Sequence, residues 1–130
     1  MKAADLMIGD WVGRVFNDKR IIEDYRQVDW IRTGEIGMRY QKVWSIGCIE
    51  PIPLTPEILE KNGFTKVNSQ RYDYGYPDTD CYVKVNPKKN MIHVNGRNAN
   101  SNLYSHSFVH ELQRALRLCG LDELADNFKV

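Results

Sequence analysis

The stretch "PIPLTPEILEKNGF" (residues 51–64) is where the sequence pattern of this chain changes from strand-like to helix-like. Thr55 followed by Pro56 is typical of a helix start, because a threonine side chain caps exposed amide groups and proline has no amide that needs a partner. Gly63 favours a helix end nearby, since glycine readily adopts the left-handed conformation that follows many helices. These signals predict a short helix over about residues 56–62.

The same stretch contains the only candidate boundary in the sequence. Pro51 and Pro53 fix their own φ angles and push the residues before them away from helical conformation, so we expect a stiff, extended connector here. We therefore divide the chain into residues 1–50 and residues 51–130, as two subregions of one compact unit.

Residues 1–50 contain short runs of β-branched and aromatic residues that are separated by turn-forming residues. The runs are "DWVGRVF" (10–16), "RIIEDYRQVDWI" (20–31), "GEIGMRY" (34–40) and "KVWSIGCI" (42–49). This composition and spacing are typical of a small antiparallel sheet or barrel. The segment "LMIGDWV" (6–12) adds a Gly-Asp turn and a strand that begins at Trp11, a pattern common in SH3-like barrels. We predict an SH3-like antiparallel barrel for this subregion.

Residues 51–130 combine the short helix with further strands and a longer helix. In "DCYVKVN" (80–86), apolar and polar side chains alternate, as they do in a strand with one buried face. "PKKN" (87–90) then predicts a hairpin link to "MIHVN" (91–95), and "FVHELQRALRLC" (108–119) has the period of a helix. The predicted fold class is α+β, with an N-terminal SH3-like antiparallel barrel, a short connecting helix, and a β-meander packed by a C-terminal helix.

The composition is that of a globular protein, and it argues against several function classes. With 130 residues, 42% of them hydrophobic and 27% charged, the chain has the size and balance of one ordered domain. The 18 basic and 17 acidic residues give no overall attraction to a polyanion. No stretch approaches the roughly 18 apolar residues that a membrane span requires, and the opening has no secretion signal, so we expect a cytoplasmic protein without membrane contact. Three cysteines without C-x-x-C spacing argue against a disulfide framework or a zinc ribbon, and we expect no cofactor.

On a helical wheel, residues 108–119 have two different faces. We expect the apolar arc to face the core, and it consists of Phe108, Leu112, Ala115, Leu116 and Cys119, with Val109 at its margin. The opposite side is polar and consists of His110, Arg114 and Arg117, flanked by Glu111 and Gln113. We place the N-cap at Ser107. The polar side is expected to face solvent or a partner, which makes it a candidate contact surface.

This helix also contains the dipeptide His-Glu, the start of the zinc-protease motif H-E-x-x-H, in which two histidines one turn apart bind the metal. Arg114 occupies the second histidine position here, and a guanidinium cannot bind the cation. A different arrangement would pair His106 with His110, and Glu111 or Asp80 would complete the ligands. The expected N-cap leaves His106 outside the helix, so we assign no metal ligands.

A row of tyrosines forms the second candidate surface. Tyr72, Tyr74 and Tyr76 would lie on one face of an extended strand. They either cover the core beneath the last helix or form a recognition surface that binds protein or stacks on bases. Residues 61–117 carry nine basic and four acidic side chains, a local net charge of +5, which keeps nucleic-acid binding as an alternative.

Three stretches stand out together, namely "LMIGDWV" (6–12), "IEPIPLTPEILEKNGF" (49–64) and "FVHELQRALRLCGLDEL" (108–124). In this order they resemble a family of small uncharacterised proteins encoded by phages, prophages and mobile elements of Bacteroidetes bacteria. The middle stretch is the most specific of the three. The resemblance implies an accessory protein inside a bacterial cell, and it implies no activity and no functional residues.

These observations favour a non-enzymatic interaction module that binds a host or phage protein. The sequence has neither the G-x-S-x-G nucleophile motif nor a Walker phosphate-binding loop. The candidate contact residues are Tyr72, Tyr74, Tyr76, His110, Arg114 and Arg117. The alternative is a nucleic-acid-binding accessory protein that uses the same surfaces. A weaker alternative is a metal-dependent enzyme built around His106 and His110.

Overall fold

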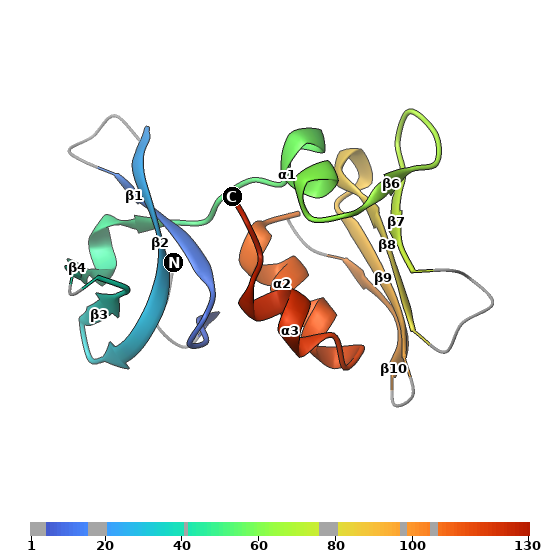
Figure 1. Cartoon of the computed structure of the whole chain (residues 1–130). Coiled ribbons are helices and arrows are strands. Elements are labelled where there is room, and N and C mark those ends of the chain that lie inside the picture. Colours follow the sequence, from blue (N-terminus) through green and yellow to red (C-terminus); the bar gives the residue numbers. More distant parts are fainter. Residues whose placement is uncertain (1–4, 16–20, 41, 76–80, 97–98, 105–106) are drawn as a thin grey trace. The chain divides into compact units, whose positions relative to one another are not determined.

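A computed structural model of the chain shows two antiparallel sheets and, among the residues that it describes, three α-helices, which confirms the predicted α+β class (Figure 1). It describes residues 5–15, 21–40, 42–75, 81–96, 99–104 and 107–130, and for 99–104 only the backbone. The chain forms two compact units, Met1–Ile52 (unit 1) and Pro53–Val130 (unit 2). The division lies inside the proline-containing connector. Within these described ranges, no helix has the length and apolar character to cross a bilayer.

Unit 1 is a five-stranded antiparallel sheet in the order β4-β3-β2-β1-β5. Its elements are β1 (Trp11–Val15), β2 (Ile22–Arg32), β3 (Glu35–Met38), β4 (Lys42–Ser45), the 3-10 helix η3 (Ile46–Cys48) and β5 (Ile49–Glu50). The prediction that a strand begins at Trp11 is confirmed.

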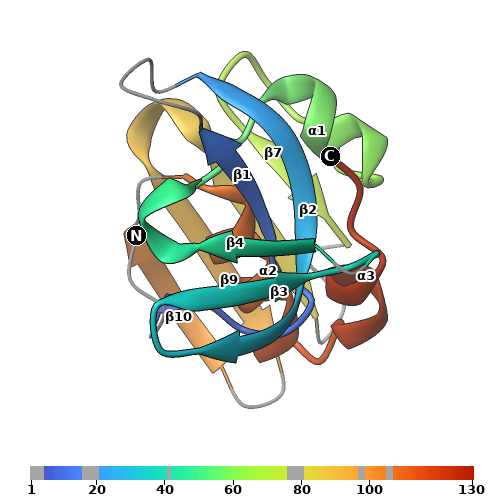
Figure 2. The same ribbon diagram turned by 90° about the vertical axis from the view of Figure 1, so that its left-hand side faces the viewer.

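The long strand β2 holds unit 1 together because it pairs with two neighbours. Its first part pairs with β1, and from Val28 onward it pairs with β3 (Figure 2). The register shifts between Val28 and Trp30, and such a bulge bends a strand. Among the described residues, the edge strands β4 and β5 do not pair with each other, so the predicted SH3-like barrel is an open antiparallel sheet here. The edge strand β5 is only two residues long, and both of its residues pair with β1.

The core of unit 1 is a single cluster of apolar side chains from the loop before β1 and from all five strands. Its members are Leu6, Val12, Val28, Ile36, Met38, Trp44 and Ile49. The largest of them, Trp44, is 2% exposed. Each strand contributes the residues of its inward face, as the period of two predicts.

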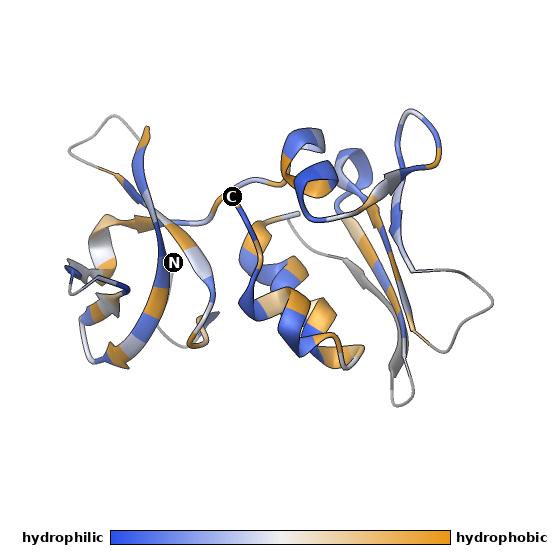
Figure 3. Ribbon diagram, viewed as in Figure 1, coloured by the Kyte–Doolittle hydropathy of each residue, from blue (hydrophilic) through white to orange (hydrophobic). Residues whose placement is uncertain are grey.

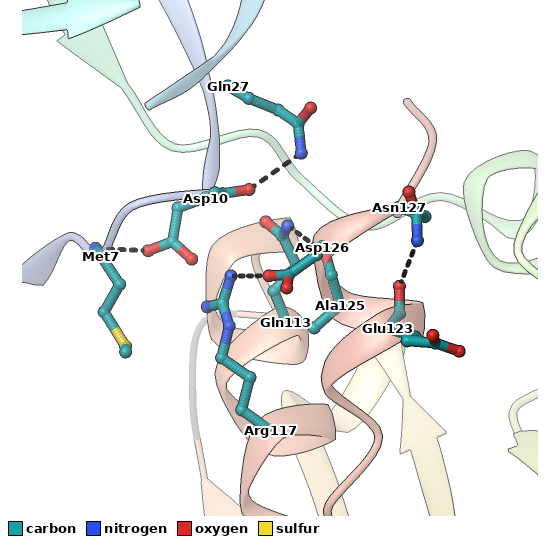
Figure 4. Close-up of polar contacts among 10 residues, drawn as sticks. Met7, Asp10, Gln27, Gln113, Arg117, Glu123, Ala125, Asp126 and Asn127 are labelled. Carbon is teal, nitrogen blue, oxygen red and sulfur yellow. Dashed lines mark hydrogen bonds and ion pairs between the residues drawn. The ribbon is translucent and has the colours of Figure 1, made fainter. Parts of the chain in front are cut away.

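The loop before β1 is fixed by polar contacts within unit 1 (Figure 4). The Asp10 carboxylate accepts a hydrogen bond from the Met7 amide at 2.8 Å, which closes the Gly-Asp turn. The amide of the Gln27 side chain donates to the Gly9 carbonyl at 3.1 Å, and the Val28 amide donates to the Asp10 carbonyl at 2.8 Å. The loop is therefore tied to the middle of β2.

The described residues of unit 2 form a five-stranded meander in the order β10-β9-β8-β7-β6, with three α-helices. Its elements are α1 (Pro56–Lys61), β6 (Thr65–Lys66), β7 (Tyr72–Tyr74), β8 (Tyr82–Asn86), the 3-10 helix η4 (Pro87–Lys89), β9 (Met91–Gly96), β10 (Ala99–Tyr104), α2 (Val109–Leu118) and α3 (Asp122–Asp126). The predicted meander and its two predicted helices are confirmed. Helix α2 packs against β9, and α3 packs against α2.

The short helix α1 confirms the local signals in the sequence. The Thr55 hydroxyl accepts a hydrogen bond from the Ile58 amide at 3.2 Å, and Pro56 is the first helical residue. Gly63 follows the helix with a φ of +84°. The hairpin link after β8 also forms as predicted, with Asn86 capping η4 through the Lys89 amide at 3.2 Å.

Asn62 ties the end of α1 to the last residues of the chain, and we expect its replacement to destabilise unit 2. Its amide nitrogen donates to the carbonyls of Ile58 at 2.8 Å and Lys129 at 2.7 Å, and its oxygen accepts from the Lys129 amide at 2.8 Å. Asn62→Ala should lower the free energy of unfolding by about 2 kcal/mol, because the polar groups left in this 7% exposed site lose their partner. The measurement is chemical denaturation.

Asn127→Ala is the matched control for this change. Asn127 also donates its side-chain amide to a backbone carbonyl, that of Glu123 at 2.9 Å, but it is exposed. Water replaces the lost partner there, so the effect should stay below about 0.5 kcal/mol. Equal losses in the two variants would contradict a structural role for the buried amide.

Candidate binding site

Two tyrosines of the predicted row, Tyr72 and Tyr74, lie on the covered face of the sheet of unit 2. Tyr72 lies opposite Val85 and Tyr74 opposite Val83 in the β7–β8 pair, so both tyrosines share the face of those buried valines. Tyr72 is 4% exposed. Tyr74 is half-buried, and its ring lies 5.4 Å from that of Phe64. Tyr76 lies outside the described residues.

The predicted exposed side of α2 is wrong for His110 and Gln113, both of which are buried. The wheel assigned one covered face, but the chain turns back at Gly120 and α3 covers a second side of the helix. On that side the Gln113 amide donates to the Ala125 carbonyl at 2.9 Å (Figure 4). The His110 ring stacks on Phe108 at 6.0 Å. Hydrophobic and hydrophilic segments both occur along α2, as Figure 3 shows, so hydropathy alone does not reveal the second covered side.

The two arginines of this helix are half-buried, and they do not form an open basic surface with His110. The Arg117 guanidinium lies 3.5 Å from the Asp126 carboxylate, and its side chain is 14% exposed. Leu112, Ala115, Leu116 and Cys119 are buried as the wheel predicted.

The start of α2 also differs from the prediction. Phe108, not Ser107, is the N-cap residue, and it makes no side-chain capping bond. Ser107 has a φ of +58°, and its carbonyl accepts a hydrogen bond from the Leu54 amide at 2.9 Å. This bond joins the residue before the N-cap to the segment before α1. His106 and Asp80 lie outside the described residues, and the described part holds no group of three or more metal-binding side chains.

A pocket in unit 1 is a third candidate site, separate from the two predicted surfaces. It has a volume of about 280 Å³ and is lined by Trp11, Tyr25, Arg26, Gln27, Arg39 and Tyr40. We call it the aromatic–arginine pocket. Trp11 begins β1, Tyr25, Arg26 and Gln27 belong to β2, and Arg39 and Tyr40 follow β3.

Backbone pairing brings these distant residues together. Trp11 lies opposite Gln27 in the β1–β2 pair, and the Arg39 amide donates to the Gln27 carbonyl at 3.0 Å. Gln27 is therefore the central residue, between the tryptophan on one strand and the turn that carries Tyr40.

Tyr40 is the most unusual residue of the pocket. It has a φ of +68°, a left-handed conformation that costs a residue with a side chain roughly 1–2 kcal/mol. The residue is 82% exposed, so burial does not compensate for this cost. The Arg26 guanidinium lies 5.8 Å from the ring centroid. Strained, exposed aromatic residues are characteristic of binding sites.

The two guanidinium groups of the pocket differ in whether an acidic side chain neutralises them. Arg26 is paired with the Asp24 carboxylate at 3.3 Å. Arg39 is exposed, and among the described residues no carboxylate lies within ion-pair distance of its guanidinium. The pocket thus offers aromatic faces beside one cation that is open to an anionic group of a ligand.

Sequence reasoning did not identify this pocket. Its residues are separated by up to 29 positions, and no motif connects them. Comparison of the chain with family models, with curated proteins and with solved structures finds no match.

Proposed function

We propose that the protein is a non-enzymatic interaction module, and that unit 1 binds a short segment of a partner protein in the aromatic–arginine pocket. The supporting observation is the meeting of Trp11, Tyr25 and Tyr40 with two guanidinium groups around one cavity. Tryptophan, tyrosine and arginine are the residues that contribute most to protein interfaces. A volume of about 280 Å³ accommodates one or two side chains, not a folded domain.

The charge of unit 1 favours a protein partner over a nucleic acid. Residues 1–52 contain eight Lys or Arg and eight Asp or Glu, so their net charge is zero. Nucleic-acid binding depends on many basic groups that neutralise phosphates, and this subregion has no such excess. The single open cation, Arg39, fits one carboxylate next to an apolar or aromatic side chain. We infer that the ligand is an acidic peptide segment with an aromatic or proline residue.

The order of elements in unit 1 supports an SH3-like assignment within the same proposal. A meander of four strands is followed by a 3-10 helix, and the last strand returns to pair with the first. Small sheets of this kind commonly present peptide-binding surfaces between their loops. The sequence resemblance adds the setting of a phage- or mobile-element-encoded accessory protein with a host or phage protein as its partner.

Tyr40→Gly should separate binding from stability. Glycine adopts the positive φ without strain, which offsets its greater entropy in the unfolded chain, so the free energy of unfolding should change by less than about 1 kcal/mol. The affinity for a pocket ligand should fall at least about tenfold, because an exposed aromatic anchor is lost. The probe is a peptide selected on the full chain from a random phage-displayed library, and the measurement is fluorescence anisotropy.

Two further variants complete this test. Val43→Ala removes an exposed side chain of β4 that does not line the pocket, so peptide affinity should be unchanged. Arg39→Glu should strongly weaken the binding of an acidic peptide, because the new carboxylate repels the charge of the peptide. A selected peptide that binds all variants equally would contradict the proposal. A labelled single-stranded oligonucleotide is the second probe. If its binding requires Tyr40 and weakens steeply with salt, the nucleic-acid alternative replaces the proposal of a peptide ligand.

A further inference from the structure

Two of the three cysteines of the chain, which are distant in sequence, come together in unit 2. The sulfur of Cys81, just before β8, lies 3.2 Å from the carbonyl oxygen of Cys119, at the end of α2. The sulfur of Cys119 in turn lies 3.9 Å from the carbonyl oxygen of Tyr82, the residue after Cys81. Each sulfur is therefore beside the backbone of the other cysteine or of its neighbour. All three cysteines are thiols in this structure.

Gly96 allows this approach. Tyr82 pairs with Asn95, so continuing the antiparallel ladder by one step places Cys81 opposite Gly96. Residues opposite each other in such a ladder are about 4.5–5.5 Å apart between Cα atoms. A Cβ atom at Gly96 would lie 3.0 Å from the Cα atom of Cys119. The end of α2 thus rests on the bare glycine backbone, directly beside Cys81.

The two thiols differ in exposure. Cys119 is 3% exposed, whereas Cys81 is half-buried. Burial raises the pKa of the Cys119 thiol, the nearby Cys81 raises it further, and a hydrogen bond with the Asn95 backbone lowers it in part. The more accessible Cys81 is consequently the thiol that meets a reagent from solution first.

We propose that Cys81 and Cys119 form a modification site, a thiol pair that a small disulfide such as oxidised glutathione converts reversibly into an intramolecular disulfide. Disulfides need Cα atoms within about 7 Å and side chains that point toward each other. The reciprocal sulfur–backbone contacts and the close approach of Cys119 to Gly96 bring the two cysteines together, which is the arrangement that such a bond needs. The site is in unit 2 and is independent of the proposed peptide binding by unit 1.

The reaction is a two-electron thiol–disulfide exchange. The Cys81 thiol loses its proton, and the thiolate attacks one sulfur of oxidised glutathione. The S–S bond of glutathione breaks, and the first reduced glutathione leaves with a proton. The Cys119 thiol then loses its proton and attacks the Cys81 sulfur of the mixed disulfide, which releases the second reduced glutathione. Both cysteines are oxidised by one electron each, and one oxidised glutathione becomes two reduced molecules.

The test is incubation of the full folded chain with oxidised glutathione, followed by intact mass and non-reducing peptide mapping. The expected product has lost about two hydrogen masses, and its cross-linked peptides join Cys81 to Cys119. The melting midpoint of unit 2 should rise by roughly 10 °C, because the cross-link restricts the unfolded chain, and dithiothreitol should reverse the rise.

Variants and an unfolded control make the test specific. Cys48→Ser should form the same cross-link, because Cys48 belongs to unit 1. Cys81→Ser and Cys119→Ala should form no intramolecular cross-link. If either variant fails to fold, peptide mapping of the unsubstituted chain shows which cysteines are joined. In urea the preference for this pair should disappear. A folded chain that carries separate glutathione adducts on Cys81 and Cys119, or that pairs Cys48 equally often, would overturn the proposal.

Discussion

Trp44→Ala should lower the free energy of unfolding of unit 1 by about 3–5 kcal/mol, the largest effect expected in that unit. Trp44 is 2% exposed and belongs to the apolar cluster that all five strands share. Its truncation removes both the buried ring and the contacts of the surrounding side chains with it. The Arg14 guanidinium, 5.7 Å from this ring, also loses its aromatic neighbour.

Hydrogen exchange of the β2 and β3 amides measures this loss, because those amides report on opening of unit 1. Val43→Ala is the matched control, since Val43 precedes Trp44 on the same strand and is 53% exposed. Val43→Ala should change the free energy of opening, as measured by exchange, by less than about 0.5 kcal/mol. Similar protection in the Trp44 variant and the original chain would show that the cluster does not stabilise the sheet.

In unit 2, Leu116→Ala should have the largest effect, a loss of about 2–5 kcal/mol in the free energy of unfolding. Leu116 is fully buried in α2, and its carbonyl accepts the hydrogen bond of the Leu121 amide at 2.9 Å where the chain turns back toward α3. Removal of the side chain leaves a cavity beneath the buried face of the helix.

Leu118→Ala provides the comparison within the same helix. Leu118 is 50% exposed, so it loses little buried area on truncation. Exchange of the β8 and β9 amides should be faster in Leu116→Ala and nearly unchanged in Leu118→Ala. The reverse order would mean that the buried face of α2 has been assigned to the wrong side.

Local signals in the sequence predicted the elements whose formation depends on near neighbours. Thr55, Pro56 and Gly63 act within one or two turns of α1, so the prediction of this helix is confirmed. The alternation in β8 and β9 places Val83, Val85 and Val94 inside, as expected. Both predictions succeeded because capping and the strand period follow from covalent geometry and short-range hydrogen bonds.

Contacts between distant segments determined the features that local signals predicted wrongly. Ser107, the predicted N-cap, instead accepts a hydrogen bond from the Leu54 amide, 53 residues away in sequence, and α2 begins after Phe108. Packing of α3 on α2 buries Gln113, which a single-face wheel leaves exposed. The predicted barrel is an open sheet among the described residues for a related reason, since closure depends on pairing between the distant edge strands β4 and β5, and these do not pair.

The sequence by itself determined the α+β class, the short capped helix, the strand that begins at Trp11 and the meander of unit 2. The tertiary structure alone brought Trp11, Gln27 and Tyr40 around one pocket and set Cys81 beside Cys119. The physical reason is the range of the interactions. Caps, turns and side-chain periods are fixed by residues a few positions apart. A site forms only after backbone pairing and packing have joined distant segments, and the sequence of one such segment does not indicate which other segment it will contact.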